Sequence, residues 1–243
     1  MCAGGGYIAF LDADDLWDKE FLAATTSRAA EGADIIYTLS DMISEENNWQ
    51  NPRPLWKNTR EGYLEDFEAA DGLNITFQTS AVLVNRSLIE DYNLRFNTNH
   101  INGEDMIFFM QLACLRPIVC VAKPLSCYRE LKRSLSHQPW IPKLQISAIT
   151  IYQELFPFAA RYRSQVVPIL EREYVHSSYM YLRGCISHGF MQAAQEAITN
   201  LAEPLEKFTK KPDEKIGRRL KCRLYIHFKN QAFMLRLINK LLG

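Results

Sequence analysis

The feature that most constrains this sequence is a short apolar run that ends in a group of carboxylates. Residues 7–17 read YIAFLDADDLW, so Asp12, Asp14 and Asp15 follow directly on the apolar residues. Carboxylates this close repel one another unless a positive charge lies among them. A continuous apolar run that ends in acids is typical of a buried parallel strand whose carboxyl end opens onto a site. The segment therefore predicts an acidic site within an α/β sheet.

The rest of the first half alternates between predicted strands and helices, which is the signature of an α/β layered domain. We expect helices over 20–30, 61–70 and 103–115, and strands over 33–42, 79–85 and, broken near Pro124, over 117–130. After Pro142 the pattern becomes helical, over 143–156, 165–203 and 213–242. The chain therefore divides into an α/β domain, 1–140, and a helical extension, 141–243.

Composition and cysteine usage narrow the class of protein. The chain has 243 residues, 47% of them hydrophobic, and its formal net charge is zero, as in ordinary soluble proteins. Its six cysteines form no CxxC pair and no zinc-type cluster, which favours reduced thiols in a cytoplasmic protein. We find no signal peptide and no uncharged apolar run near the roughly 20 residues of a membrane span.

The last predicted helix, 213–242, is amphipathic and basic. Ile216, Leu220, Leu224 and Phe228 recur at a spacing of four, and the same face continues through Leu235, Ile238 and Leu242. From Lys207 onward there are eleven Lys and Arg residues and two acids. Such a helix is typical of peripheral contact with an anionic membrane, here the inner face of the cell membrane. The alternative is a helix packed on the protein with its basic face in solvent; no motif suggests nucleic acid.

The acidic motif has the chemistry of a divalent metal site. Asp12 and Asp14 flank one residue, and alternate residues of an extended chain point the same way. Mg²⁺ takes oxygen ligands, usually one or two carboxylates together with substrate phosphates, and Mn²⁺ has similar preferences. Asp15 can tie down the following turn. The alternative is a strand end followed by acids that cap a helix.

Three motifs together resemble a known family. Residues 5–37, GGYIAFLDADDLWDKEFLAATTSRAAEGADIIY, resemble the metal-binding segment of the inverting nucleotide-sugar glycosyltransferases of family 2, which have the GT-A fold. GED at 103–105 and YRELKRSLS at 128–136 are similar to the family's later motifs in order and approximate spacing. The resemblance covers roughly residues 3–137. It implies a truncated GT-A (Rossmann-like) mixed sheet with flanking helices, followed here by a helical region.

The resemblance implies a role for each acid. Asp14 would be the direct ligand of Mg²⁺ or Mn²⁺, and Asp12 would contact the ribose or share the metal. Asp105 would be the general base that deprotonates the acceptor hydroxyl, with Glu104 positioning the acceptor or the loop. Attack from the face opposite the diphosphate inverts the anomeric configuration. The alternative for Glu104 and Asp105 is that they stabilise the start of a helix.

A basic segment follows the last predicted strand. The resemblance places Tyr128, Arg129, Lys132 and Arg133 near the donor phosphates, where cations stabilise the departing diphosphate. Their alternative is a solvated basic loop. Leu131 stands where the family commonly has His, and leucine binds neither metal nor phosphate.

The tryptophans have two interpretations. Trp17 fits packing in the core or the turn. Trp49, Trp56 and Trp140 can either pack or stack on an acceptor sugar.

The position of the motif near the first residue predicts a missing portion. In this fold the metal motif follows roughly 75–90 residues that hold the nucleotide base, whereas six residues precede Tyr7. We expect the chain alone to bind nucleotide sugars poorly.

The resulting functional prediction is a bacterial glycosyltransferase. It would move a sugar from a UDP- or GDP-linked donor to a hydroxyl of a growing or lipid-linked cell-surface glycan, such as lipopolysaccharide or capsule. One alternative is a non-catalytic remnant of such an enzyme. The other is a haloacid-dehalogenase-like phosphohydrolase, which also uses D-x-D but requires Thr or Val where Leu16 and Trp17 follow here.

Overall fold

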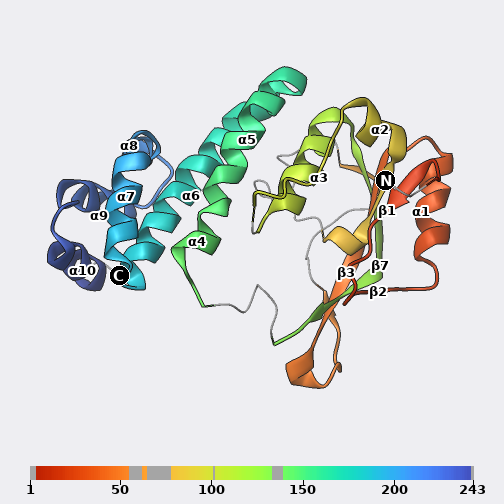
Figure 1. The fold of residues 1–243 in the computed structure, drawn as a ribbon, viewed down its shortest axis with the longest axis horizontal. Helices are drawn as coiled ribbons and strands as arrows, with labels where there is room; N and C mark the ends of the chain where they lie inside the picture. Colours follow the sequence, from red (N-terminus) through yellow and green to blue (C-terminus); the bar gives the residue numbers. More distant parts are fainter. Residues whose placement is uncertain (1–3, 55–61, 65–77, 101, 133–138, 242–243) are drawn as a thin grey trace. The chain divides into compact units, whose positions relative to one another are not determined.

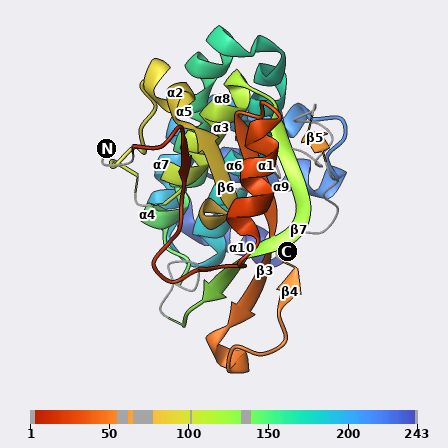
Figure 2. The ribbon, with the colours of Figure 1, turned by 90° about the vertical axis from the view of Figure 1, so that its right-hand side faces the viewer.

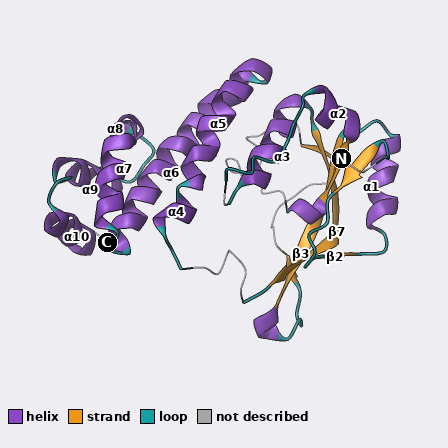
Figure 3. Ribbon diagram, viewed as in Figure 1, coloured by secondary structure: helices purple, strands orange, loops and turns teal. Residues whose placement is uncertain are grey.

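The computed structural model describes residues 4–54, 62–64, 78–100, 102–132 and 139–241. The chain forms two compact units. The first, here called the sheet unit, comprises residues 1–100, 104–138 and 157–166, and the second, the helical unit, comprises 101–103, 139–156 and 167–243. Figure 3 shows that the described strands belong to the first unit, whereas the described elements of the second are helices.

The sheet unit is built on a mixed sheet of seven described strands. Its main path runs β1-β6-β3-β7-β2, with β4 paired to β3 and β5 to β7. The strands are β1 (Tyr7–Ala9), β2 (Leu16–Trp17), β3 (Ile35–Ser44), β4 (Arg53–Pro54), β5 (Gly62–Leu64), β6 (Val82–Asn85) and β7 (Ile118–Glu130). The two long strands β3 and β7 are parallel, and the other pairs are antiparallel.

Helices cover both faces of this sheet. Figures 1 and 2 show α1 (Phe21–Ala30) along one face and α2 (Arg86–Asp91) and α3 (Glu104–Leu115) on the other. Phe21 of α1 is buried in one cluster with Ile36, Leu83 and Val119. The alternate strand residues are also buried, because side chains along a strand point to opposite faces. The centre of the sheet is therefore apolar on both sides.

Three expectations about single strands were wrong. The strand after Gly6 is antiparallel to β6, not parallel to a neighbour, and its residues are only half-buried. Residues 62–64 of the expected helix 61–70 form a strand against β7, so pairing with an exposed edge outweighs local helix preference; residues 65–70 lie outside the described part. β7 continues through Pro124 without the expected break, although its register against β3 shifts at Pro124, which pairs with Leu39.

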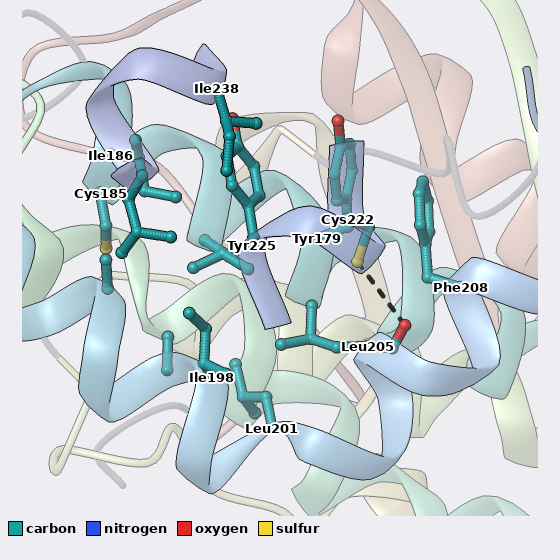
Figure 4. Close-up of a cluster of buried hydrophobic side chains, with 14 of the residues drawn as sticks. Tyr179, Cys185, Ile186, Ile198, Leu201, Leu205, Phe208, Cys222, Tyr225 and Ile238 are labelled. Carbon is teal, nitrogen blue, oxygen red and sulfur yellow. Dashed lines mark hydrogen bonds between the residues drawn. The ribbon is translucent and has the colours of Figure 1, made fainter. Parts of the chain in front are cut away.

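The helical unit contains α4 (Pro142–Gln145), the first part of α5 (Ser147–Tyr162), α6 (Val167–Ser187), α7 (Met191–Asn200), α8 (Ala202–Lys210), α9 (Ile216–His227) and α10 (Ala232–Leu241). Its core joins side chains from α6 to α10, and Figure 4 shows part of it. Tyr179 stacks on Phe208 at 4.1 Å between ring centroids. Burial raises the pKa of the Cys222 thiol to about 12, so the thiol stays protonated and donates to the Leu205 carbonyl oxygen at 3.6 Å.

The expectation of one continuous helix over 213–242 was wrong. The helix α9 ends at His227, and a turn in which the Gln231 N–H donates to the Phe228 carbonyl oxygen separates α9 from α10. The expected apolar face is also divided, because Tyr225 and Cys222 rather than Leu220 face the core of the helical unit. Leu235 and Ile238 are buried in that core, and Leu242 lies outside the described residues.

Candidate active site

The acidic loop after β1 is held by its most buried member. Asp15 is 5% exposed, and its backbone N–H donates to the Asp12 carbonyl oxygen at 3.0 Å, which closes a tight turn. Its carboxylate accepts hydrogen bonds from the Ser80 hydroxyl at 2.6 Å, from the backbone N–H of Arg129 at 3.0 Å and from the Gln78 amide. Asp15 therefore joins three segments that are far apart in the sequence.

Asp12 and Asp14 are left free by this arrangement. Asp12 is exposed and Asp14 half-buried, whereas Asp15 is enclosed. Within the described part of the chain, no donor is hydrogen-bonded to the carboxylate of either residue. The turn therefore uses Asp15 for structure and presents the other two carboxylates to solvent or to a ligand.

Ser80 is the centre of the hydrogen-bond network. It is fully buried in the short 3-10 helix η2 (Thr79–Ala81), and its hydroxyl accepts the Asp12 N–H at 3.0 Å while donating to Asp15. Its carbonyl oxygen accepts the Trp17 indole N–H at 2.6 Å. Trp17 also stacks on Phe21, with 4.4 Å between ring centroids, so this tryptophan has the packing role that the sequence favoured.

Asp105 lies against the same short helix. Its carboxylate accepts from the Thr79 hydroxyl at 3.4 Å and from the backbone N–H of Met106 at 2.7 Å. Thr79 is the direct neighbour of Ser80, so adjacent residues contact Asp105 and Asp15. Gly103, at φ +87°, makes the left-handed turn that begins α3 and that other residues adopt only with strain.

An aromatic cluster fixes the start of α3 beside the end of β1. Phe10 makes edge contacts with Phe96, Phe108 and Phe109, with ring centroids 5.7–5.8 Å apart. Phe108 and Phe109 belong to α3, and Phe10 lies two residues before Asp12. Packed aromatic pairs contribute beyond their buried area. This cluster therefore places the two acidic motifs near each other.

Burial and the neighbouring negative charges both act on Asp12 and Asp105. Partial loss of water raises the pKa of Asp12, and the negative charges of Asp15, Asp14, Asp105 and Glu104 raise it further, in that order. Burial also raises the pKa of Asp105, with a contribution from Glu104, against the hydrogen bonds from Met106 and Thr79 that lower it. Carboxylates crowded in this way favour a cation or a shared proton.

Two buried acceptor atoms in this region have no partner. Among the described side chains, Glu104 Oε2 and Gln78 Oε1 are buried without a hydrogen-bond donor. The Gln78 amide must turn its N–H toward the Asp15 carboxylate, so its oxygen faces away. A buried acceptor left unpaired costs about 1–3 kcal/mol. Both atoms are therefore suited to accept from a ligand hydroxyl or to meet a cation.

The donor set fits a hard divalent cation only in part. No three His, Cys, Asp or Glu side chains gather into a complete metal site within the ranges that the structure describes. A cation bound to a nucleoside diphosphate needs only one or two protein carboxylates, because phosphate oxygens and water supply the rest. The free carboxylates of Asp12 and Asp14, the raised pKa of Asp12 and the unpaired Glu104 oxygen all suit such a cation.

The end of β7 brings a cation to this loop. The Arg129 Nε–H donates to the Asp14 carbonyl oxygen, and its guanidinium carbon lies 5.9 Å from the centroid of the Trp49 ring. Tyr128 is half-buried one residue earlier on β7. Lys132 is exposed, and its backbone N–H donates to Glu45 Oε2 at 3.0 Å. Arg133 and Trp56 lie outside the described residues.

The structure thus brings Asp12, Asp14, Asp105 and Glu104 into one electrostatic field, with Arg129 beside Asp14. Lys132 is joined to Glu45 through its backbone N–H. Sequence reasoning missed the segment 78–80, which connects the acids. Its only signal was a polar Gln-Thr-Ser run directly before an apolar strand.

Comparison with known proteins gives a family match for the first part of the chain. Residues 1–92 match the model of the family described as glycosyl transferase family 2. No curated protein matches the chain.

Solved structures share the fold. The crystal structure of residues 1–349 of TarS from S. aureus in complex with UDP has a TM-score of 0.55 at 13% identity, over 98% of this chain and 67% of that one. A second crystal structure of the same TarS residues gives 0.51 at 14% identity, over the same shares. At these identities the likeness concerns the fold, which is a mixed sheet with flanking helices of the GT-A type followed by helices. Residues 1–92 of the chain therefore resemble glycosyl transferase family 2, and the chain shares the fold of TarS.

Proposed function

We propose that the sheet unit transfers a sugar from a nucleoside-diphosphate donor to a hydroxyl group of a glycan, with inversion at the anomeric carbon. The observation that carries this proposal is the network around η2, in which Thr79 contacts Asp105 while Ser80 contacts both Asp15 and Asp12. A base and a charge sink are needed on opposite sides of the reacting carbon. Asp105 and the Asp12–Asp14 pair supply these two parts within one network.

The donor diphosphate is proposed to bind beside the free carboxylates of Asp12 and Asp14. Asp14, with Asp12, would hold Mg²⁺ or Mn²⁺, and the ion would neutralise negative charge on the departing diphosphate. Arg129 is held at the Asp14 carbonyl oxygen, which positions its charge toward the same phosphates, and Tyr128, Lys132 and Arg133 are further candidates along this segment. The bound UDP of the fold neighbour supports a UDP-linked donor over a GDP-linked one.

Asp105 is the proposed general base that removes the proton of the acceptor hydroxyl group. Its raised pKa makes its carboxylate a stronger base than an ordinary aspartate, and its two hydrogen bonds fix its direction. Glu104, with one oxygen unpaired, would accept from a second acceptor hydroxyl and orient the sugar. The acceptor would be a growing or lipid-linked cell-surface glycan, such as a lipopolysaccharide or capsule chain in a bacterium.

A membrane-facing role for the end of the chain remains part of the proposal. No described helix has the length and hydrophobicity to cross a bilayer. On α9, Ile216 (75% exposed) and Leu220 lie on one face with Arg223, and on α10, Phe233 (74% exposed) lies on one face with Arg236. Neither helix contains an acidic residue. Exposed apolar side chains among cations favour contact with anionic lipid, on the cytosolic side of the cell membrane.

The donor assignment predicts weak UDP binding that depends on a divalent ion and on Asp14. UDP is titrated with and without Mg²⁺, and backbone amide shifts are followed by NMR. Replacing Asp14→Asn should weaken binding by about tenfold or more in Mg²⁺ and remove the effect of the ion. Asp91→Asn, at an exposed position on α2, serves as the control and should bind as the parent chain does. UDP binding that ignores both Mg²⁺ and Asp14 would contradict the assignment.

The Asp105 assignment predicts a gain in stability together with a loss of activity. Folding raises the pKa of Asp105 above its ordinary value of 3.8. The folded chain therefore loses stability as the pH rises from 3.8 through the pKa that Asp105 has in the folded chain. Asp105→Asn removes this loss of stability. At pH values above the raised pKa, the variant should therefore melt at a higher temperature than the parent chain. At pH values below 3.8, the two melting temperatures should approach each other. Transfer should fall by about a hundredfold or more.

A second variant separates this effect from simple repacking at Asp105. Thr79→Val removes a hydrogen bond that lowers the pKa of Asp105, so the pH window of the stability loss should move to higher pH. An Asp105→Asn chain that is less stable than the parent at every pH would show that Asp105 is a structural ion and not a base.

The membrane proposal predicts loss of vesicle binding on removal of two exposed side chains. The combined change Leu220→Ser and Phe233→Ser should reduce co-flotation with vesicles of phosphatidylcholine and phosphatidylglycerol, because it removes apolar area that enters the interface. Raising the salt concentration should weaken binding by the parent chain. Leu22→Ser, an exposed leucine on α1, is the control. Equal flotation by the double variant and the control would exclude this surface.

A further inference from the structure

The hairpin between β3 and β4 presents an exposed tryptophan. Trp49 is 39% exposed and follows the short 3-10 helix η1 (Glu45–Asn47). Its φ is +61°, and its neighbours Asn48 and Asn51 also have positive φ, at +49° and +57°. Asparagine adopts this region readily, whereas a bulky residue does so at a cost of about 1–2 kcal/mol. The hairpin therefore holds Trp49 in a strained conformation that burial does not explain.

Contacts on both sides fix the position of this hairpin. Trp49 N–H donates to the Ser44 carbonyl oxygen at 3.1 Å, which closes the turn. β4 pairs with β3, and Arg53 on β4 forms an ion pair with Glu130 at 3.6 Å. Glu45 accepts the backbone N–H of Lys132 at 3.0 Å. The tip of the hairpin is therefore tied to the end of β7, which also carries Arg129.

Arg129 connects Trp49 to the acidic loop. Its guanidinium carbon lies 5.9 Å from the Trp49 ring centroid, within the range of a cation–π contact. The same side chain donates to the Asp14 carbonyl oxygen, and its backbone N–H donates to Asp15. Arg129 thus connects the exposed ring to the loop that carries Asp14 and Asp15.

We propose that Trp49 is a stacking platform for a pyranose ring of the acceptor glycan, an inference that rests on the proposed function. A pyranose has a polar rim and an apolar face of C–H groups, and a tryptophan ring offers a large, rigid apolar surface to such a face. Arg129 supports the ring from the side of the donor loop. The platform orients the acceptor, while Asp105 and Glu104 meet its hydroxyl groups.

The test measures glycan binding without any transfer reaction. The full chain is titrated with soluble tetrasaccharides of glucose (α1,4- and β1,4-linked) and of N-acetylglucosamine, and binding is followed by saturation-transfer NMR and calorimetry. We expect at least one of these to bind the parent chain. Trp49→Leu, which keeps apolar volume but removes the aromatic face, should bind about tenfold more weakly, and Trp49→Phe should retain most of the affinity. Thermal unfolding of each variant shows whether it is folded.

A parallel UDP titration distinguishes the possible failures. The platform is refuted if no tetrasaccharide binds, or if Trp49→Leu and Trp49→Phe bind glycans equally well. In either case, UDP binding by the same chain leaves the proposed function standing. If Trp49→Leu instead weakens UDP binding and spares glycans, the ring stacks on the nucleobase and the inference is also wrong. If UDP itself fails to bind, the proposed function fails independently of Trp49.

Discussion

The buried carboxylate of Asp15 is the interaction on which the site depends. It accepts hydrogen bonds from Gln78, Ser80 and the backbone of Arg129, so the loop after β1, the turn before β6 and the end of β7 meet at one side chain. A buried charge is tolerated only when such donors surround it. Because Asp15 satisfies this structural need, Asp12 and Asp14 remain free for a ligand. Asp15 therefore has a structural role, whereas Asp12 and Asp14 are the candidates for a functional role.

The cluster carries an electrostatic cost in the free protein. Asp12 and Asp105 both have raised pKa values, and Glu104 and Gln78 each leave a buried oxygen without a donor. Structural stability alone would select against such an arrangement, since each feature lowers the free energy of unfolding. A ligand that brings a divalent cation and hydroxyl groups would relieve both features at once. We propose that ligand binding offsets this cost.

Short-range patterns in the sequence predicted much of the fold and singled out acids that the structure brings close together. The apolar run ending in acids gave a strand followed by a loop, and Gly-Glu-Asp before an apolar segment gave the start of α3. The pairing of β1 with β6 and of β5 with β7 was not predictable, because it depends on which strand edges are open. The role of Ser80 was also hidden, since its partners lie 63 to 68 residues away in the sequence. At the end of the chain, Ile216 and Leu220 have the helical spacing of core residues, yet both are exposed, and Cys222 and Tyr225 are buried in the core.

The central claim is that one bound metal–diphosphate group faces Asp12 and Asp14 while Asp105 lies beside it. Paramagnetic broadening by Mn²⁺ in the presence of UDP tests this claim directly, because the effect falls steeply with distance from the ion. We predict that the amide signals of residues 12–15, 78–80, 104–106 and 129 broaden together at the same low Mn²⁺ concentration. Broadening at residues 12–15 with sharp signals at 104–106, or broadening centred in the helical unit, would contradict it.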